Sequence, residues 1–404
     1  MITVLSRLIC LFIILSFATA SAVTNTSFSA TPNADKKEKK AKKPKEPTDF
    51  EKAIIAYKKD DFATALMLWF PLAEKGNAEA QFSIGKMYLD QKGQRKDPSE
   101  AAEWILKAAK QNHVDAQTLI GQMHLKGVGV KRNFNTAAKW FLKAARQKDK
   151  QAQYILGKLY YYGDGVAKST SKAAYWYKKA AKQGHTEAQN KLALMYLTGD
   201  GIKKKPKEAK KWFEKAALNG NTHAQINLAK LYIDSDVVKK DKNKAFNWYQ
   251  KAALQGDAEA QNQTGVMLEN GIGTNKDIKN AIKWYQKSAK QDYPPAHYNM
   301  GRVYVHGYNV KKDFKKGVHH FHKAAENGYG KAQMDLGVAY YTGRGVAPDS
   351  AIAYAWFYVA AATNVKDARK TKNSLYKKLT PEDKKSAVSL ATEYKRKYFK
   401  RPDR

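Results

Sequence analysis

The chain has 404 residues, 43% of them hydrophobic, which is enough for a long packed core or for two or three ordinary domains. Lys and Arg number 73 against 37 Asp and Glu, and the net charge of +36 favours acidic protein surfaces, anionic polysaccharides, lipid headgroups or nucleic acid as partners. The single cysteine, Cys10, lies in the N-terminal apolar stretch. The rest of the chain therefore has no disulfide, no thiolate nucleophile and no Cys-ligated zinc.

The N-terminus has the pattern of a secretory signal peptide over residues 1–22. Arg7 supplies the positive charge, and the apolar stretch at 8–17 is too short to span a bilayer comfortably. Two small-x-small cleavage patterns follow, at 18–20 and 20–22. We expect cleavage, after which no transmembrane segment remains; the alternative is an uncleaved anchor.

Residues 23–47 are predicted to form a disordered basic linker. The run at 35–47 is dominated by lysine and has no apolar periodicity that could be buried. We interpret it as a solvated spacer, and the alternative is a basic arm that touches an anionic surface.

The next part of the chain is an internal repeat. An Ala-Gln or Ala-His pair recurs every 36 residues, at 80–81, 116–117, 152–153, 188–189, 224–225, 260–261, 296–297 and 332–333. Five residues after each alanine stands a glycine or another alanine. A further register with the same period holds Trp104, Trp140, Trp176, Trp212, Trp248, Trp284, His320 and Trp356.

Each period predicts two helices. In the second repeat, residues 115–125 have a helical apolar face, and Gly127 and Gly129 follow as helix-ending residues. The second helix should begin after an N-cap residue, a role that seven of these eight can fill: Asp97, Asn133, Ser169, Lys205, Asp241, Asp277, Asp313 and Asp349. We expect the small residues to let helices approach and the tryptophan to fill the space between neighbouring pairs.

These features predict an all-α, right-handed α-solenoid, or superhelix, of helix-turn-helix repeats. An N-terminal capping helix pair is expected over 48–75 and eight 36-residue repeats over 76–363. C-terminal capping helices and a basic tail should occupy 364–404, with the last helix running from Thr380 to about Tyr398.

The repeat resembles the Sel1-like repeat, a relative of the tetratricopeptide repeat. The family pattern is matched at Ala152, Leu156, Gly157, Tyr160, Gly163, Gly165, Val166, Ala173, Trp176, Lys179, Ala180, Ala181 and Gly184. The resemblance implies an adaptor that presents a curved helical surface to partner proteins. Exported bacterial members resemble factors for envelope maintenance or host-cell entry. This chain lacks the disulfides of the cysteine-rich subgroup, so the β-lactam activities claimed for that subgroup are not implied.

We find no sequence pattern typical of catalysis. The chain has no phosphate-binding glycine motif, no H-E-x-x-H motif and no Ser-His-Asp spacing, so we predict no enzyme activity, no cofactor and no metal site. His306, His319, His320 and His322 form a local cluster that suits a transition-metal or pH-sensing site. We favour the alternative, in which His320 takes the tryptophan position of a diverged repeat and its neighbours face solvent.

Two series of cations follow the 36-residue period. The first ladder contains Lys96, Arg132, Lys168, Lys204, Lys240, Lys276 and Lys312, and the second contains Lys107, Lys143, Lys179, Lys215, Lys251, Lys287 and Lys323. Equal offsets stack in a solenoid, so each series should place one cation per repeat along one edge. They are interpreted either as binding sites for an extended polyanion or as family lysines whose stems cover tryptophan and alanine surface.

The recognition surface is expected on the first helix of each pair, as in tetratricopeptide relatives. Its variable positions lie two and six residues after each repeat alanine. The proposed protein-binding pairs are Phe82/Lys86, Tyr154/Lys158, Ile226/Lys230 and Tyr298/Arg302. The same positions elsewhere hold Thr118/Gln122, Asn190/Leu194, Asn262/Val266 and Met334/Val338.

Two functions are consistent with these features. The first is an exported, non-enzymatic scaffold that binds protein partners on its concave face, in envelope function or in host-cell interaction. The second is a surface protein that binds lipopolysaccharide, cell-wall polymer or host glycan through the cation ladders. We expect the periplasm, the cell surface or the medium of a Gram-negative bacterium, and export argues against nucleic acid as the partner.

Overall fold

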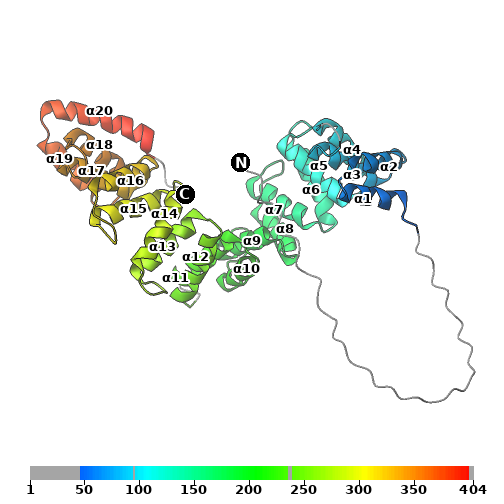
Figure 1. The fold of residues 1–404 in the computed structure, drawn as a ribbon, viewed down its shortest axis with the longest axis horizontal. Coiled ribbons are helices and arrows are strands. Elements are labelled where there is room, and N and C mark those ends of the chain that lie inside the picture. The colour runs from blue at the N-terminus through cyan, green and yellow to red at the C-terminus, as the bar shows by residue number, and fades with distance from the viewer. Residues whose placement is uncertain (1–45, 94–95, 235–238, 400–404) are drawn as a thin grey trace, which may run out of the picture. The chain divides into compact units, whose positions relative to one another are not determined.

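The computed structural model describes residues 46–93, 96–234 and 239–399, and within these ranges the chain forms helices and no strands (Figure 1). The signal peptide expected at 1–22, residues 23–45 of the expected linker and the tail at 400–404 lie outside the described residues. The helical unit begins at Thr48. The predicted all-α solenoid is confirmed for it.

The helices follow one another as antiparallel pairs, each packed on the next. The first pair is α1 (Asp49–Lys58) and α2 (Phe62–Glu74). Eight first helices follow: α3 (Ala78–Asp90), α5 (Val114–Lys126), α7 (Lys150–Tyr162), α9 (Thr186–Thr198), α11 (Thr222–Asp234), α13 (Ala258–Asn270), α15 (Pro294–His306) and α17 (Gly330–Thr342). Their partners are α4 (Pro98–Lys110), α6 (Phe134–Arg146), α8 (Thr170–Lys182), α10 (Pro206–Leu218), α12 (Lys242–Leu254), α14 (Ile278–Ala289), α16 (Phe314–Glu326) and α18 (Ser350–Ala362).

Two further helices close the C-terminal end. α19 (Ala368–Lys378) packs on α18, and α20 (Pro381–Tyr398) contacts both α18 and α16 (Figure 1). The ring of Trp356 stacks on Tyr398 with centroids 5.2 Å apart, which ties α20 to the last repeat. The tryptophan is only 1% exposed as a result.

The predicted N-caps are confirmed at seven of the eight second helices. Asp97, for example, accepts hydrogen bonds from the backbone N–H groups of Ser99 and Glu100. Lys205 is the exception, with no side-chain cap; Pro206 at the first helical position has no N–H, so one fewer backbone donor needs a partner at this helix end.

The loop of each repeat lies against the preceding repeat. Gly165 has a φ of 68°, and a Cβ atom there would come within 2.3 Å of the Phe134 carbonyl carbon. Gly201 meets Thr170 and Ser171 in the same way. Glycine is needed at this position because the backbone is left-handed and because another backbone occupies the space. Successive loops therefore stack along one edge of the repeats.

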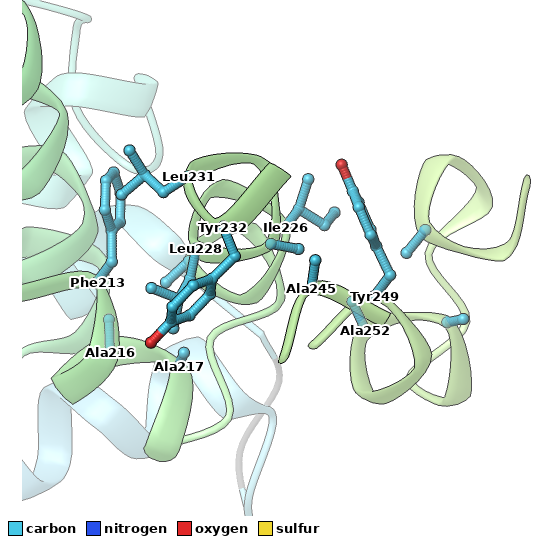
Figure 2. Packing of buried hydrophobic residues seen from close by; sticks show 14 of the residues in the cluster. Phe213, Ala216, Ala217, Ile226, Leu228, Leu231, Tyr232, Ala245, Tyr249 and Ala252 are labelled. Carbon is cyan, nitrogen blue, oxygen red and sulfur yellow. The ribbon is translucent and has the colours of Figure 1, made fainter. Parts of the chain in front are cut away.

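Trp140 packs against a core formed by α4 and α5, and Trp176 against one formed by α6 and α7, so these tryptophans contact the preceding helix pair as predicted. Trp140, Trp176, Trp212, Trp248 and Trp284 are only half-buried. The residue after each tryptophan is the buried one, and Figure 2 shows this packing around Phe213 and Tyr249. The register holds Ile105, Phe141, Tyr177, Phe213, Tyr249, Tyr285, Phe321 and Phe357.

The conserved spacing of small residues follows from this buried register. A Cβ atom at Gly157 would lie 2.7 Å from the Tyr177 ring, and one at Gly121 would lie 3.0 Å from Phe141. The first helix thus carries glycine or alanine where the ring of its partner helix crosses it. This contact sets the close approach within each pair.

A ladder of buried glutamines connects the repeats. Gln153 donates to the carbonyl of Ala145 at 3.0 Å, and its own oxygen accepts from Gln183 at 2.8 Å. Gln117, Gln225 and Gln261 make the same pair of contacts. The Ala-Gln pair is therefore a hydrogen-bond connection between helices as well as a packing element.

Candidate functional site

The two variable positions of each first helix differ in exposure. The position six residues after the repeat alanine is exposed in Lys86, Lys158 and Lys230. The position two residues after it is half-buried where it is aromatic, and it is buried at Thr118, Asn190, Ile226 and Asn262. The earlier position therefore packs between repeats, and the later one faces solvent where it holds a lysine.

Tyr154 illustrates the packing of the aromatic residues. Its ring stacks on His185, the N-cap residue of the next first helix, with centroids 4.4 Å apart. Phe82 packs on His113 in the same way at 4.7 Å. The Lys158 and Lys86 ammonium groups lie 6.0 Å and 5.9 Å from these rings. Each pair thus presents an exposed cation beside an aromatic edge, a combination typical of protein interfaces.

Ile226 is a correction to the expected binding surface. Its side chain is 4% exposed and lies in the central core cluster, so it contacts neighbouring helices and not a partner. Lys230, the other member of that pair, is exposed but forms an ion pair with Glu259 of the following repeat at 2.7 Å.

The Tyr298/Arg302 pair belongs to a polar network that the sequence analysis missed. Arg302 lies 3.3 Å from Glu269, which also accepts a hydrogen bond from the Tyr285 hydroxyl at 2.5 Å. Burial, together with the Asp335 carboxylate, raises the pKa of Tyr298, and burial also raises the pKa of Asp335. One signal was present: Glu269 is the only acid in a register of the first helices that is otherwise aliphatic or aromatic.

The first cation ladder lies in the loops between the two helices of each repeat and is exposed throughout. Lys168 packs its Cβ against Gly163, and Arg132 covers the Phe134 ring at 4.6 Å. Because Gly165 touches Phe134, consecutive members of the ladder are joined through direct backbone contacts. The stacking predicted from the period is therefore present between these repeats.

The second cation ladder packs on aromatic rings. Lysine ammonium groups lie 3.9–4.7 Å from tryptophan ring centroids at Lys107, Lys143, Lys215, Lys251 and Lys287. Lys179 covers Tyr175 at 5.5 Å instead. These lysines shield the half-buried rings from water, so the structure favours their interpretation as framework residues.

The four histidines singled out by the sequence analysis do not gather at one site. His306 stacks on Tyr308, with ring centroids 5.1 Å apart, and His322 shares a 3.1 Å hydrogen bond with the Tyr340 hydroxyl. His319 is exposed. In the described part of the chain, no group of three or more His, Cys, Asp or Glu side chains is arranged to hold a metal ion.

The close contact of His320 is with a histidine that the sequence analysis overlooked. Its Nδ1 lies 3.1 Å from Nδ1 of His297, which takes the place of glutamine in the buried ladder. His297 also approaches Asp292 at 3.4 Å, and Tyr304 stacks on His320. Burial, together with His297 and His319, lowers the pKa of His320 to about 4. The substitution of histidine in the Ala-Gln register was the signal for this pair.

None of the helices in the described ranges combines the length and the apolarity that a bilayer span requires.

Comparisons with known proteins agree with the repeat architecture. The Sel1 repeat model matches eight consecutive segments: 78–113, 114–149, 150–185, 186–221, 222–257, 258–293, 294–329 and 330–363. A comparison with curated proteins finds no match.

Two solved structures are similar over long stretches. One is c5321, a protective antigen present in uropathogenic Escherichia coli strains that displays an SLR fold; it is 33% identical with a TM-score of 0.82, covering 87% of this chain and 76% of that one. The other is a Sel1 repeat protein from Oxalobacter formigenes, 32% identical with a TM-score of 0.54, covering 60% of this chain and 96% of that one. The chain belongs to the Sel1 repeat family.

Proposed function

We propose that this protein is an exported adaptor that binds a partner protein through the first helices of its repeats. Sel1 repeat proteins are generally scaffolds for protein interaction and are typically non-enzymatic. The observation that carries the proposal is the pair of exposed lysines, Lys86 and Lys158, each beside a partly exposed aromatic ring.

Export to the periplasm or the cell surface is part of the proposal. It is supported by the charged and apolar pattern of residues 1–22, and by the similarity to a protective antigen of uropathogenic strains. A role in envelope function or host-cell interaction follows from such a location. Mass determination of the mature protein and fractionation of the producing cells test this part: a full-length cytoplasmic chain contradicts it.

The partner-binding surface can be tested by charge reversal at the two exposed lysines. The variant Lys86→Glu/Lys158→Glu leaves the stacked rings in place, whereas removal of Tyr154 disrupts packing between repeats. A tagged wild-type chain and this variant are compared as baits in extracts of the native organism. We expect a defined protein to be captured by the wild type and lost from the variant.

A matched control separates this surface from net charge. Lys110→Glu/Lys182→Glu reverses the same number of charges in the same two repeats, at the exposed ends of the second helices. Capture of the partner should survive in this control. If both variants bind like the wild type, the first-helix surface is not the binding site.

Polyanion binding is a second candidate function, because the first cation ladder is exposed in every repeat that carries it. Lipopolysaccharide, cell-wall polymer and host glycan are the substances to test. Association through exposed charges weakens steeply with salt, since screening shortens their range. Binding that is unchanged between low and high salt contradicts this function.

A further inference from the structure

The first cation ladder is not uniform along the chain. At Lys96, Lys276 and Lys312 the next residue is the aspartate that caps the following helix. At three consecutive repeats the cap is neutral or basic: Asn133 after Arg132, Ser169 after Lys168 and Lys205 after Lys204. We call the segment defined by Arg132, Lys168 and Lys204 the loop edge.

Positive potential therefore concentrates at the loop edge. An aspartate cap offsets both the neighbouring lysine and the positive end of its helix, and here no such offset exists. Lys131 and Lys203 add exposed cations beside two of the three members. Nearby carboxylates are few: Asp164 is exposed, Asp200 interacts with the Tyr161 hydroxyl, and Glu208 pairs with Lys211 at 2.9 Å.

A cavity of about 600 Å³ is lined by α6, α7 and the loop that leads to Lys168. Its apolar lining includes Leu142, Leu156, Val166 and the ring of Tyr160. Asn135 and Lys139 supply polar groups to the lining. Ala167, the residue before Lys168, forms part of its mouth. The volume lies within the roughly 300–1,000 Å³ of ligand pockets, and the apolar lining suits a hydrophobic group.

We propose that the loop edge binds an acidic, extended protein segment and that one apolar side chain of this segment enters the cavity. This extends the adaptor function to a second surface, which contains neither Lys86 nor Lys158. Helix axes in packed pairs lie about 8–10 Å apart, so the three cations span about 20 Å. About six residues of extended chain cover that distance.

Electrostatic repulsion argues against two other occupants of the loop edge. The chain's own N-terminal run at 35–47 is lysine-rich, and a second copy of the protein carries a net charge of +36, so both are repelled from this surface. A polysaccharide supplies negative charge but no apolar side chain for Leu142 and Val166. An acidic peptide satisfies both features.

The experiment measures binding of a fluorescein-labelled peptide of about twelve residues that alternates Glu and Leu. Anisotropy is recorded with the full mature chain, with Arg132→Gln/Lys168→Gln/Lys204→Gln, and with the matched control Lys96→Gln/Lys276→Gln/Lys312→Gln. We expect the first triple to weaken binding by about tenfold or more, because each exposed charge pair changes affinity about two- to fivefold. The control triple should stay within about threefold of the wild type. Circular dichroism confirms that both are folded.

The cavity is tested separately with Ala167→Phe, which fills its mouth without a change in charge. Ala347→Phe is the matched control at the corresponding position of the last repeat. We expect Ala167→Phe, but not Ala347→Phe, to weaken binding of the Glu–Leu peptide. A Glu–Ala peptide should bind weakly to the wild type and to both variants.

Three results overturn the proposal. The first is no binding of the peptide by the wild type, and the second is an equal loss of peptide affinity in both triple variants. The third is tighter binding of a heparin oligosaccharide than of the peptide, together with unchanged binding in Ala167→Phe. The last of these identifies the loop edge as a polysaccharide site. Since Lys86→Glu/Lys158→Glu leaves this edge intact, the adaptor function and the loop-edge proposal can fail independently.

Discussion

The side-chain oxygen of Gln189 has no hydrogen-bond partner because Asn219 stands where the equivalent repeats place glutamine. In the next repeat, Gln255 donates to Gln225 at 2.8 Å. Asn219 is one methylene shorter, and among the described residues Gln189 Oε1 is one of the few buried side-chain atoms left unsatisfied. The glutamine ladder is therefore interrupted within the fourth repeat, between α9 and the end of α10, while the bonds of Gln189 to Ala181 and of Gln225 to Ala217 remain.

Asn219→Gln should restore this connection and stabilise the protein by about 1 kcal/mol, the usual net value of a hydrogen bond. Urea unfolding followed by circular dichroism measures the change. The reverse substitution, Gln255→Asn, should cost a similar amount by leaving Gln225 without its donor. If Asn219→Gln has no effect, water already satisfies the Gln189 oxygen.

The His297–His320 pair should make the seventh repeat sensitive to acid. Burial lowers the pKa of His297 and lowers that of His320 from 6.5 to about 4. The unfolded chain then binds more protons than the folded one between these values, so stability is lost as the pH falls from about 6.5 towards 4. We expect a loss of about 2 kcal/mol, limited by the partial exposure of His320.

The groups around the pair support this direction. Asp292 approaches His297 and favours its protonation, whereas His319 and Lys323 oppose it. Urea unfolding of the wild type and of His297→Gln/His320→Trp at pH 7 and pH 4.5 provides the comparison. The double variant, with the residues typical of other repeats, should lose less stability in acid. If the wild type and the double variant lose the same stability between pH 7 and pH 4.5, the acid sensitivity comes from other titratable groups.

Gly157→Ala should destabilise the third repeat by about 1–3 kcal/mol although alanine is the better helix former. The added Cβ atom would lie 2.7 Å from the Tyr177 ring, whose surroundings are fully packed. Thermal unfolding measures the loss. Ala193→Gly is the informative counterpart, since the fourth repeat already accommodates a methyl group; it should cost about 1 kcal/mol through helix propensity alone.

Glu269→Leu should destabilise the sixth and seventh repeats by about 2–3 kcal/mol. Leucine suits the register, but Arg302 would lose its ion-pair partner and the Tyr285 hydroxyl would lose its acceptor. The double variant Glu269→Leu/Arg302→Gln removes the unpaired charge and should recover part of this loss. Urea unfolding of the single and double variants tests the coupling: additive effects contradict it.

The repeat and its helices were predictable from sequence because each depends on local, periodic chemistry. N-caps such as Asp97 and loop glycines such as Gly163 act within a few residues, so their spacing marks the helix ends directly. The seven identical intervals between the eight repeat alanines then required each pair to pack on the next. Composition and period therefore determined the fold class.

The surface was less predictable, because exposure depends on contacts between repeats. A helical wheel places Tyr154 and Lys158 on one face of α7, and Ile226 lies at the position of Tyr154 in α11. Only the neighbouring helix decides how far each side chain is covered. The degree of burial in the tryptophan register was equally hard to predict. Trp140 and Phe141 are both apolar, and only the geometry of the helix pair buries the phenylalanine fully and leaves the tryptophan half-buried.

By itself, the sequence determined that this is a helical array of 36-residue repeats with an excess of positive charge, because period and composition are properties of the chain alone. Tertiary structure decided how each charge is used. It placed Lys143 over Trp140, paired Lys230 with Glu259 and left Arg132 exposed beside a cavity. The physical reason is that a cation's role depends on what lies within a few ångströms of its charged group. For Lys143 that neighbour is on its own helix, and for Lys230 it comes from the following repeat.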